Sequence, residues 1–287
     1  MHIPVRGKRL SKTSKGVGKK HRTKGRKDHY LPQGYLRGFI SPSRGELQKP
    51  LWYFDAHRKQ WSELSPAEIG FERGFYDSRG LETNVETADQ VFAELERTFP
   101  LVRDEMVADQ FSKWPDHLDF LLRYFQMMRA RSPLAFEQRQ ARDRNHQFLK
   151  VVKVSGRAVT YEPVQVTDAF LKNKAIAEMR EEIQKGADWL NRFHWALRYS
   201  VSPDMPFILS DTPCIVEGKF STLEEAMQRP DTLIVFPLCW QACLFGSLAP
   251  FDVRTDEFSS EDLQKMHRKH FDKAREFIVS PVKLDGL

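Results

Sequence analysis

The chain has 287 residues, of which 40% are hydrophobic and 12% aromatic, enough to bury the core of one large domain or two small ones. It contains no charge-free stretch of 18 apolar residues, and its basic N-terminus lacks the apolar run of a secretory signal, which argues against a membrane-spanning or secreted protein. The three cysteines, an odd number in a chain too large to need disulfides, fit a reducing cytoplasm. We expect buried free thiols at Cys214, Cys239 and Cys243 rather than structural zinc.

Positive charge is concentrated at the N-terminus. Residues 1–28 contain eleven of the 45 lysines and arginines and one of the 39 acidic residues, so this segment carries +10 and the rest of the chain −4. Glycine, serine and threonine separate these charges, and apolar side chains are too few to offset the entropy of ordering. We therefore expect a disordered basic tail over 1–28 and a single domain over 29–287.

A polybasic, glycine-spaced segment binds polyanions by releasing their counterions, without reading sequence. We expect RNA or DNA as its partner, held by Lys19, Lys20, Arg22, Lys24, Arg26 and Lys27. The same segment also fits a solvated extension that maintains solubility, a misassigned start codon, or attraction to an acidic partner or a membrane surface. A transit peptide fits less well, because such peptides favour arginine and an amphipathic helix.

The first elements are short and aromatic. Apolar anchors begin at His29, and Pro32 suits the first turn of a helix. Residues 51–55 and the segment beginning at Trp61, separated by a polar run, predict a β-hairpin. A third short strand is predicted at 70–72 or 74–77.

The middle of the chain is helical. Apolar residues recur at three- and four-residue steps from Val85 to Met106, which predicts an amphipathic helix that Pro100 kinks or splits. A second, central helix is predicted over 116–130. Residues 135–152 have a polar helical pattern, 154–161 a loop or short strand, and Thr167 or Asp168 begins a long helix that extends to about Asn191.

Strands return in the C-terminal third. Residues 193–201 alternate as a half-buried strand does, and short apolar runs follow near 207–210, 234–236, 243–245 and 277–279, with a helix at 260–276. Helices in the middle and strands at both ends predict one α+β domain. Its mostly antiparallel sheet is built from the N- and C-terminal regions around a central helical region.

Signatures of the large enzyme classes, such as a phosphate-binding loop, a dinucleotide fingerprint or a nucleophile elbow, are missing. Four polar residues at apolar junctions remain as candidates for catalysis: His29, Glu96, Arg131 and Asp211. His29 has the side chain of a base or metal ligand, and Arg131 that of an anion clamp.

Each candidate can equally serve a structural role. His29 can cap a turn and Glu96 can face solvent. Arg131 can satisfy the carbonyls at a helix end or form an ion pair, and Asp211, in Ser-Asp-Thr-Pro, suits a turn.

At these same positions the chain resembles an uncharacterised bacterial family catalogued as domain of unknown function 4238. The similar segments are a His-Tyr-x-Pro-x-x-Tyr-Leu motif at 29–36, an aromatic hairpin containing Tyr53-Phe54-Asp55, Phe75-Tyr76, Leu95-Glu96, Arg131-Ser132-Pro133, Trp195, Ser210–Pro213 and Phe236-Pro237-Leu238. Serine at 132 replaces the usual threonine, and Cys239-Trp240 replaces small polar residues. The resemblance covers the chain after the tail and implies no particular activity.

Two functional hypotheses follow. The first is a nucleic-acid-associated binding module tethered by the basic tail. The alternative is a hydrolase, a nuclease or phosphodiesterase, in which His29, Glu96 and Asp211 bind Mg²⁺ or Mn²⁺ and Arg131 stabilises phosphoryl charge. The residues do not decide between them, and they identify no metal site and no cofactor outside the second hypothesis.

Overall fold

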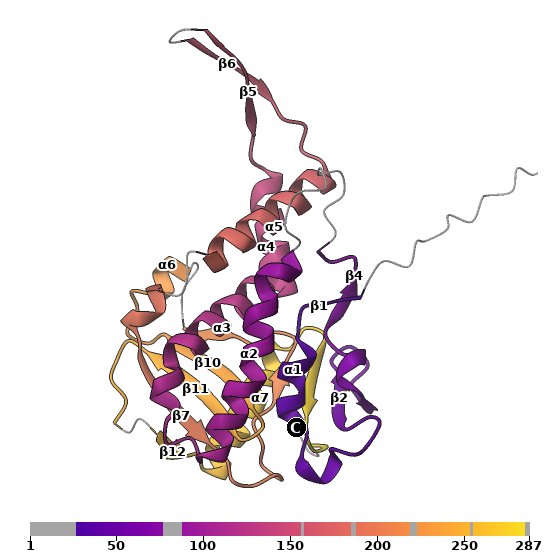
Figure 1. Cartoon of the computed structure of the whole chain (residues 1–287), viewed down its shortest axis with the longest axis vertical. Coiled ribbons are helices and arrows are strands. Elements are labelled where there is room, and N and C mark those ends of the chain that lie inside the picture. Colours follow the sequence, from indigo (N-terminus) through magenta and orange to yellow (C-terminus); the bar gives the residue numbers. More distant parts are fainter. Residues whose placement is uncertain are drawn as a thin grey trace, which may run out of the picture.

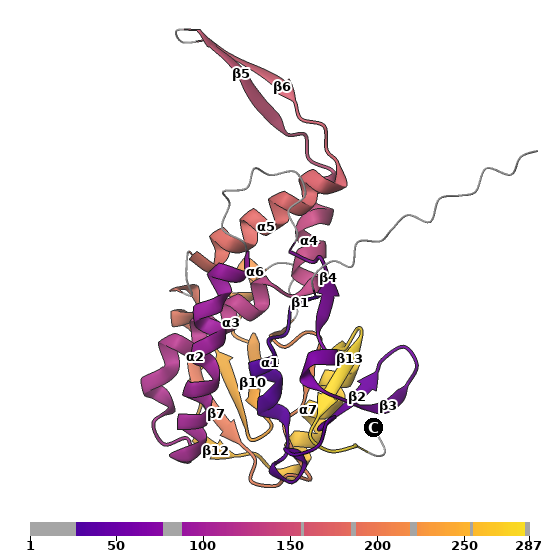
Figure 2. The same ribbon diagram turned by 45° about the vertical axis from the view of Figure 1, so that its right-hand side comes forward.

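The computed structural model describes residues 27–76, 88–155, 158–184, 188–218, 223–252 and 255–284. Within these ranges the strands form two larger sheets and two separate ribbons, with helices packed around them (Figures 1 and 2). The α+β class expected from the sequence is confirmed.

One larger sheet joins the two ends of the domain. Its strand order is β3-β2-β13-β8, all antiparallel, with β2 at Leu51–Asp55, β3 at Gln60–Leu64, β8 at Leu209–Ser210 and β13 at Phe277–Ser280. The predicted hairpin is therefore correct, and its first strand pairs with the last strand of the chain. This is the predicted sheet with strands from both terminal regions.

A second sheet comes from the C-terminal third alone. Its order is β12-β7-β11-β10-β9, with β7 at His194–Tyr199, β9 at Ile215–Glu217, β10 at Leu233–Cys239, β11 at Ala242–Ser247 and β12 at Thr255–Glu257. Only the β12–β7 pair in it is parallel. Both faces are covered, so Ala196 is as buried as Leu197, and the expected half-buried alternation is lost.

The helices are α1 (Gln33–Leu36), α2 (Ala88–Ala108), α3 (Leu118–Ala130), α4 (Pro133–Arg144), α5 (Asp168–Gln184), α6 (Leu223–Ala226) and α7 (Ser260–Lys273). Short 3₁₀ turns lie at Arg37–Phe39, Pro42–Arg44, Pro66–Glu68, Trp114–His117 and Asp188–Arg192. The longest, α2, continues through Pro100 rather than splitting there, and Val85 lies outside the described residues. None of the helices in the described ranges is both long and apolar enough to cross a membrane.

Close packing of α1 accompanies the proline in α2. A Cβ atom on Gly34 would lie 2.9 Å from Cγ of Pro100, so only glycine lets the two helices approach this closely. Arg103, one turn further along α2, donates to the carbonyl of Gly34 over 2.8 Å. Both contacts hold α1 against the part of α2 where proline removes a helical hydrogen bond.

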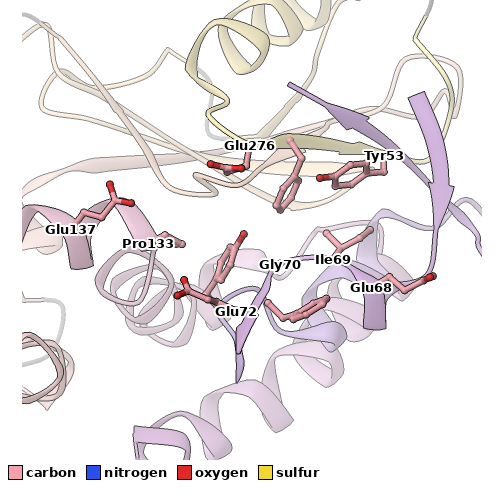
Figure 3. Close-up of a pocket in the computed structure, with 11 residues that line it drawn as sticks. Tyr53, Glu68, Ile69, Gly70, Glu72, Pro133, Glu137 and Glu276 are labelled. Carbon is pink, nitrogen blue, oxygen red and sulfur yellow. The ribbon is translucent and has the colours of Figure 1, made fainter. Parts of the chain in front are cut away.

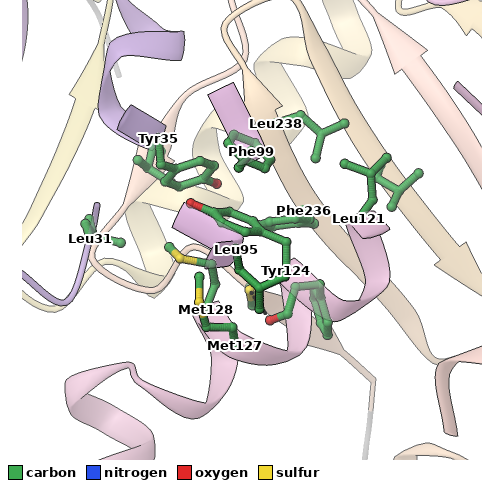
Figure 4. Close-up of a cluster of buried hydrophobic side chains, with 14 of the residues drawn as sticks. Leu31, Tyr35, Leu95, Phe99, Leu121, Tyr124, Met127, Met128, Phe236 and Leu238 are labelled. Atoms are coloured by element: carbon green, nitrogen blue, oxygen red, sulfur yellow. Dashed lines mark hydrogen bonds between the residues drawn. The ribbon is translucent and has the colours of Figure 1, made fainter. Parts of the chain in front are cut away.

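The core is centred on α3, as its apolar face predicts. Tyr124 stacks on Phe99 of α2 at 4.0 Å between ring centroids, and Phe125 meets Phe236 of β10 edge-on at 5.4 Å (Figure 4). Tyr35 of α1 packs on the same group and donates its hydroxyl to the carbonyl of Pro237 over 2.5 Å. On the other side of the second sheet, α7 packs Leu263 and Met266 against Val235, Cys243 and Phe245. All three cysteines are buried free thiols, as expected.

The folded body begins two residues earlier than the tail boundary predicted. Lys27 and Asp28 belong to β1 (Lys27–His29), which pairs with β4 (Phe71–Arg73), the predicted third strand. Asp28 is buried and accepts a hydrogen bond from the backbone N–H of Tyr76, which satisfies its carboxylate. The ammonium of Lys27 lies 4.2 Å from the ring centroid of Phe71, and residues 1–26 lie outside the described residues.

The polar helix predicted at 135–152 is shorter and is followed by a hairpin. After α4 ends at Arg144, β5 (Leu149–Ser155) and β6 (Ala158–Pro163) form a ribbon that projects away from both sheets (Figures 1 and 2). Then α5 begins after Thr167, whose hydroxyl accepts from the N–H of Phe170, as predicted. It is described as far as Gln184, and the last predicted residues, near Asn191, form the 3₁₀ turn Asp188–Arg192 instead. Arg129 of α3 and Arg139 of α4 both pair with Glu182, which ties these two helices to α5 near its C-terminal end.

Candidate functional site at the root of the N-terminal segment

Arg131 lies at the end of α3, where the chain turns sharply into α4. Pro133 disfavours helical geometry at the preceding residue, and Ser132 is accordingly extended. The Ser132 hydroxyl then accepts from the N–H of Ala135 and caps α4 over 3.2 Å. This turn directs the Arg131 side chain into the protein, where the residue is 2% exposed.

The guanidinium of Arg131 connects three separate segments. Its Nε donates to the hydroxyl of Tyr76 over 3.0 Å, Nη1 donates to the carboxylate of Glu96, and Nη2 donates to the backbone carbonyl of His29. The ring of Phe92 packs against its face, 4.5 Å from the guanidinium carbon. We call this group of Arg131, Glu96, Tyr76, Phe92 and the His29 carbonyl the arginine clamp.

The positive charge of Arg131 is balanced within the clamp itself. Burial alone would lower the pKa of Arg131, but Tyr76 and Glu96 outweigh it and hold the pKa above its usual value. A buried charge is stable in a protein when hydrogen bonds and a counter-charge satisfy it, and all three guanidinium nitrogens of Arg131 have such partners. The clamp therefore has the chemistry of a structural tie that fixes β1 to α2 and α3.

His29 contributes its carbonyl to the clamp, while its ring lies against Phe71 at 5.6 Å. The Nε2 atom is buried and has no hydrogen-bond partner within the described ranges. Burial lowers the pKa of His29, the backbone of Ala67 opposes this, and the charges of Lys27 and Arg131 lower it further. The ring is therefore held neutral, the form in which Nε2 can accept a proton or bind a metal.

The carboxylate of Asp211 forms hydrogen bonds outside the clamp. Its Oδ1 atom accepts backbone N–H groups of Arg275 and Glu276 over 3.0 and 3.2 Å and, more weakly, that of Phe277 over 3.4 Å. Burial raises the pKa of Asp211, and these hydrogen bonds counteract the rise. The carboxylate fixes the start of β13, in line with the turn role that its sequence context allows.

The structure thus brings His29, Glu96 and Arg131 together and gives Asp211 different partners. Among the described residues, no three histidine, cysteine, aspartate or glutamate side chains are grouped as a metal site requires. Lys27 is the one predicted nucleic-acid contact inside the described ranges. Lys19, Lys20, Arg22, Lys24 and Arg26 lie outside them.

A pocket of about 410 Å³ lies beside the clamp, between β4, β13 and the start of α4 (Figure 3). Four glutamates line it: Glu68, Glu72, Glu137 and Glu276. Two are partly neutralised, Glu137 by Arg275 at 3.0 Å and Glu68 by Lys49 at 3.5 Å, and Glu276 lies 3.2 Å from Nε2 of His57. Burial raises the pKa of Glu72, and nearby Lys172 partly offsets that rise.

Two tyrosines complete the pocket wall. Tyr30 is 8% exposed, and burial together with the charge of Asp211 raises the pKa of its hydroxyl. Burial raises the pKa of Tyr53 to about 12, and the charge of Asp55 adds to this. Carboxylates and phenols together favour a cationic group and repel a phosphate.

Sequence reasoning missed the pocket residues and two members of the clamp. Tyr76 and Phe92 lie in aromatic segments that the sequence placed correctly, but nothing near them in the chain points to Arg131, which is 55 residues from Tyr76. The pocket glutamates come from three separate segments, around 68–72, 137 and 276, and share no motif. The local signals of the clamp were the polar residues at apolar junctions, His29, Glu96 and Arg131.

The comparisons with known proteins agree with this organisation. No curated protein and no solved structure is similar enough to count as a match. The matched segment of the family model begins at Lys27, the first residue of β1, and ends at residue 283. The chain therefore belongs to the family described as "Protein of unknown function (DUF4238)", whose model matches residues 27–283.

Proposed function

We propose that the protein is a nucleic-acid-associated binding module, in which the basic N-terminal segment binds the phosphate backbone and the folded body anchors that segment. The segregation of charge carries the proposal: ten lysines and arginines precede residue 27, while the chain after residue 28 has a net charge of −4. Lys and Arg runs of this density bind polyanions through counterion release.

The anchoring of the segment supports the proposal. The chain enters the body through β1, whose His29 carbonyl accepts from Arg131 and whose Asp28 accepts from the backbone of Tyr76. A polyanion held by residues 1–26 would thus be connected to the core through a fixed strand. Because Lys27 packs on Phe71, the candidate binding residues are those that precede it.

The body itself offers little to a phosphate. The pocket at the root of the segment is lined by four carboxylates, which repel a polyanion at short range. Binding would consequently reside in the N-terminal segment rather than spread over the body.

Deletion of residues 2–26, which leaves β1 intact, tests the proposal. We expect fluorescence anisotropy with labelled single-stranded RNA and DNA to show loss of binding, while the melting temperature stays within a degree or two. Unchanged affinity after the deletion would refute the proposal.

A variant in which neutral glutamine replaces basic residues of the N-terminal segment sharpens the test. Glutamine at the five predicted contacts before Lys27 should reduce the slope of log affinity against log salt by up to roughly 3.5–4.5, about 0.7–0.9 for each phosphate no longer neutralised. The five positions are Lys19, Lys20, Arg22, Lys24 and Arg26. The matched control carries five substitutions by glutamine on the body, at Lys113, Arg123, Lys150, Lys153 and Lys265, and should retain the slope.

A hydrolase is the second candidate, and the observation in its favour is the buried Nε2 atom of His29, which has no hydrogen-bond partner in the part of the chain that the structure describes. Arg131 and Asp211 count against it, because the three guanidinium nitrogens of Arg131 and the Oδ1 atom of Asp211 already form hydrogen bonds with protein groups. Incubation of the chain with RNA and DNA in Mg²⁺ or Mn²⁺ separates the two functions. Cleavage that His29→Ala abolishes would support the hydrolase, and absence of cleavage by the natural chain would remove it.

A further inference from the structure

The β5–β6 hairpin has a feature that the proposed function does not use. It forms a sheet of its own, pairing only within itself among the described strands, and it projects from the ends of α4 and α5 (Figures 1 and 2). An isolated two-stranded hairpin is marginally stable in water, and packing of one face against another surface is what normally stabilises it.

The strand register sorts the side chains of the hairpin into two different faces. Cα partners are Leu149 with Pro163, Val151 with Tyr161 and Val154 with Val159. Side chains of alternate pairs point to the same face, so one face is entirely apolar. The opposite face consists of Lys150, Lys153, Ser155, Ala158, Thr160 and Glu162.

A bulge keeps the apolar face continuous. The register shifts between Val151 and Lys153, so Val152 is the extra residue on β5. Without this shift Lys153 would fall on the apolar face and Val154 on the polar one. The irregularity thus maintains a charge-free surface over the full length of the ribbon.

This apolar face is open to solvent in the single chain. Leu149 is 56% exposed, Val151 55%, Val154 66%, Val159 41% and Tyr161 55%. With Val152 at 42%, the exposed apolar surface is on the order of 500 Å² per chain, a size at which such a patch marks an interaction site.

We propose that two copies of the chain associate through this face, hairpin against hairpin, about a two-fold axis. Two identical apolar faces would bury roughly 1,000 Å² in total, the lower limit for a specific protein interface. Packed about 10 Å apart, as sheets pack, they form a four-stranded sandwich in which each hairpin covers the other. A self-complementary patch of this kind is what a two-fold interface needs.

Charge and composition favour a second copy over other occupants. The basic N-terminal segment has too few apolar residues to cover the face, and a nucleic acid would find its cations, Lys150 and Lys153, on the opposite face. A lipid surface would likewise leave both lysines directed away from the headgroups. The base of the ribbon is held by Arg142, which pairs with Glu178 of α5 at 2.5 Å. This ion pair holds together the two helices from which the ribbon projects.

Sedimentation velocity of the full chain at about 1–100 µM tests the inference. The test variant is Val159→Lys, and Thr160→Lys is its matched control. Both replaced residues are β-branched neighbours on β6, but Val159 is on the apolar face and Thr160 on the polar one. We expect the natural chain and Thr160→Lys to double in mass with concentration, and Val159→Lys to require at least tenfold more protein to do so. Tyr161→Ser should weaken association in the same direction.

Any of three results would overturn the inference. A natural chain that stays monomeric up to about 100 µM would do so, as would equal dimerisation of Val159→Lys and Thr160→Lys with unchanged far-ultraviolet circular dichroism. Flotation with phosphatidylcholine vesicles that is lost in Val159→Lys would assign the face to a lipid surface instead. These measurements use protein free of nucleic acid, so their outcome is independent of the proposed function.

Discussion

The arginine clamp and the β5–β6 hairpin depart from the usual distribution of polar and apolar side chains in opposite directions. Arg131 is charged and 2% exposed, whereas Val154 is apolar and 66% exposed. The clamp satisfies its buried charge with partners from the same chain, while the hairpin leaves its exposed apolar face uncovered. A buried charge whose partners all come from the same chain indicates a structural role. An exposed apolar face that the same chain leaves uncovered indicates a binding partner.

Replacement of Arg131 should have the largest effect. Arg131→Met removes the guanidinium and leaves the Tyr76 hydroxyl, the Glu96 carboxylate and the His29 carbonyl without their donor, so we expect a loss of about 3–5 kcal/mol in the free energy of unfolding. Urea denaturation measures this. Arg123→Met, which replaces an exposed arginine on the same helix, is the control and should cost no more than about 0.5 kcal/mol. A loss below about 1 kcal/mol for Arg131→Met would show that the clamp is not a tie.

Acid should lower the free energy of unfolding through a buried histidine that has no hydrogen-bond partner among the described residues. Both ring nitrogens of His270 on α7 lack hydrogen-bond partners within the described residues, and burial lowers its pKa to about 3. Between about pH 6.5 and pH 3, His270 is therefore protonated in the unfolded chain and neutral in the folded chain. The stability due to the neutral ring is complete above about pH 6.5 and declines by up to 1.4 kcal/mol per pH unit as the pH falls.

The variant His270→Leu should remove this part of the decline between about pH 6.5 and 4.5, as measured by urea denaturation at several pH values. The control is His194→Gln, a substitution of an exposed histidine at the start of β7, which should leave the decline as it is. An unchanged acid slope in His270→Leu would refute the assignment.

Two buried tyrosines offer a smaller contrast of the same kind. Tyr35 donates to the carbonyl of Pro237, whereas the hydroxyl of Tyr124, stacked on Phe99, has no hydrogen-bond partner among the described residues (Figure 4). We expect Tyr35→Phe to cost about 1 kcal/mol and Tyr124→Phe to be neutral or stabilising. Thermal melts of the two variants side by side decide this, and equal destabilisation would count against it.

The hairpin should show the smallest effect on the folding of the single chain. Val154→Thr with Val159→Thr removes apolar surface that is already in water, so at concentrations below dimerisation the free energy of unfolding should change by no more than about 0.5 kcal/mol. Urea denaturation of dilute protein measures this. A loss above about 1.5 kcal/mol would mean that the face is covered within one chain.

Much of the fold could be predicted from local patterns. The hairpin at 51–64 and the central helix ending at Ala130 carry strong period-2 and period-3.6 signals, and strands at both ends predicted the sheet that joins β2 to β13. Residues 149–152 were misassigned to a helix because the bulge at Val152 interrupts the period-2 alternation of β5. Local patterns predicted a kink or break of α2 at Pro100, and they gave no sign of the close approach of Gly34 to that proline.

The candidate site was predictable only in part. Polar residues at apolar junctions identified Glu96, Arg131 and His29, which the structure brings together. Asp211 looked similar in sequence, but its partners are backbone groups 64 to 66 residues away. The pocket depends on how β4, β13 and α4 meet in space, and no local pattern encodes that meeting.

The pairing of β2 with β13 has a consequence for synthesis of the chain. Roughly 220 residues separate these strands, so at about 5–20 residues per second a ribosome needs some 10–45 s between completing one and completing the other. During that interval β2 and β3 wait without their central partner, and the edge of β2 is open. The sheet that contains β2 is therefore completed only near the end of synthesis, and until then the aromatic hairpin at 51–64 has an unpaired edge that can pair with other chains.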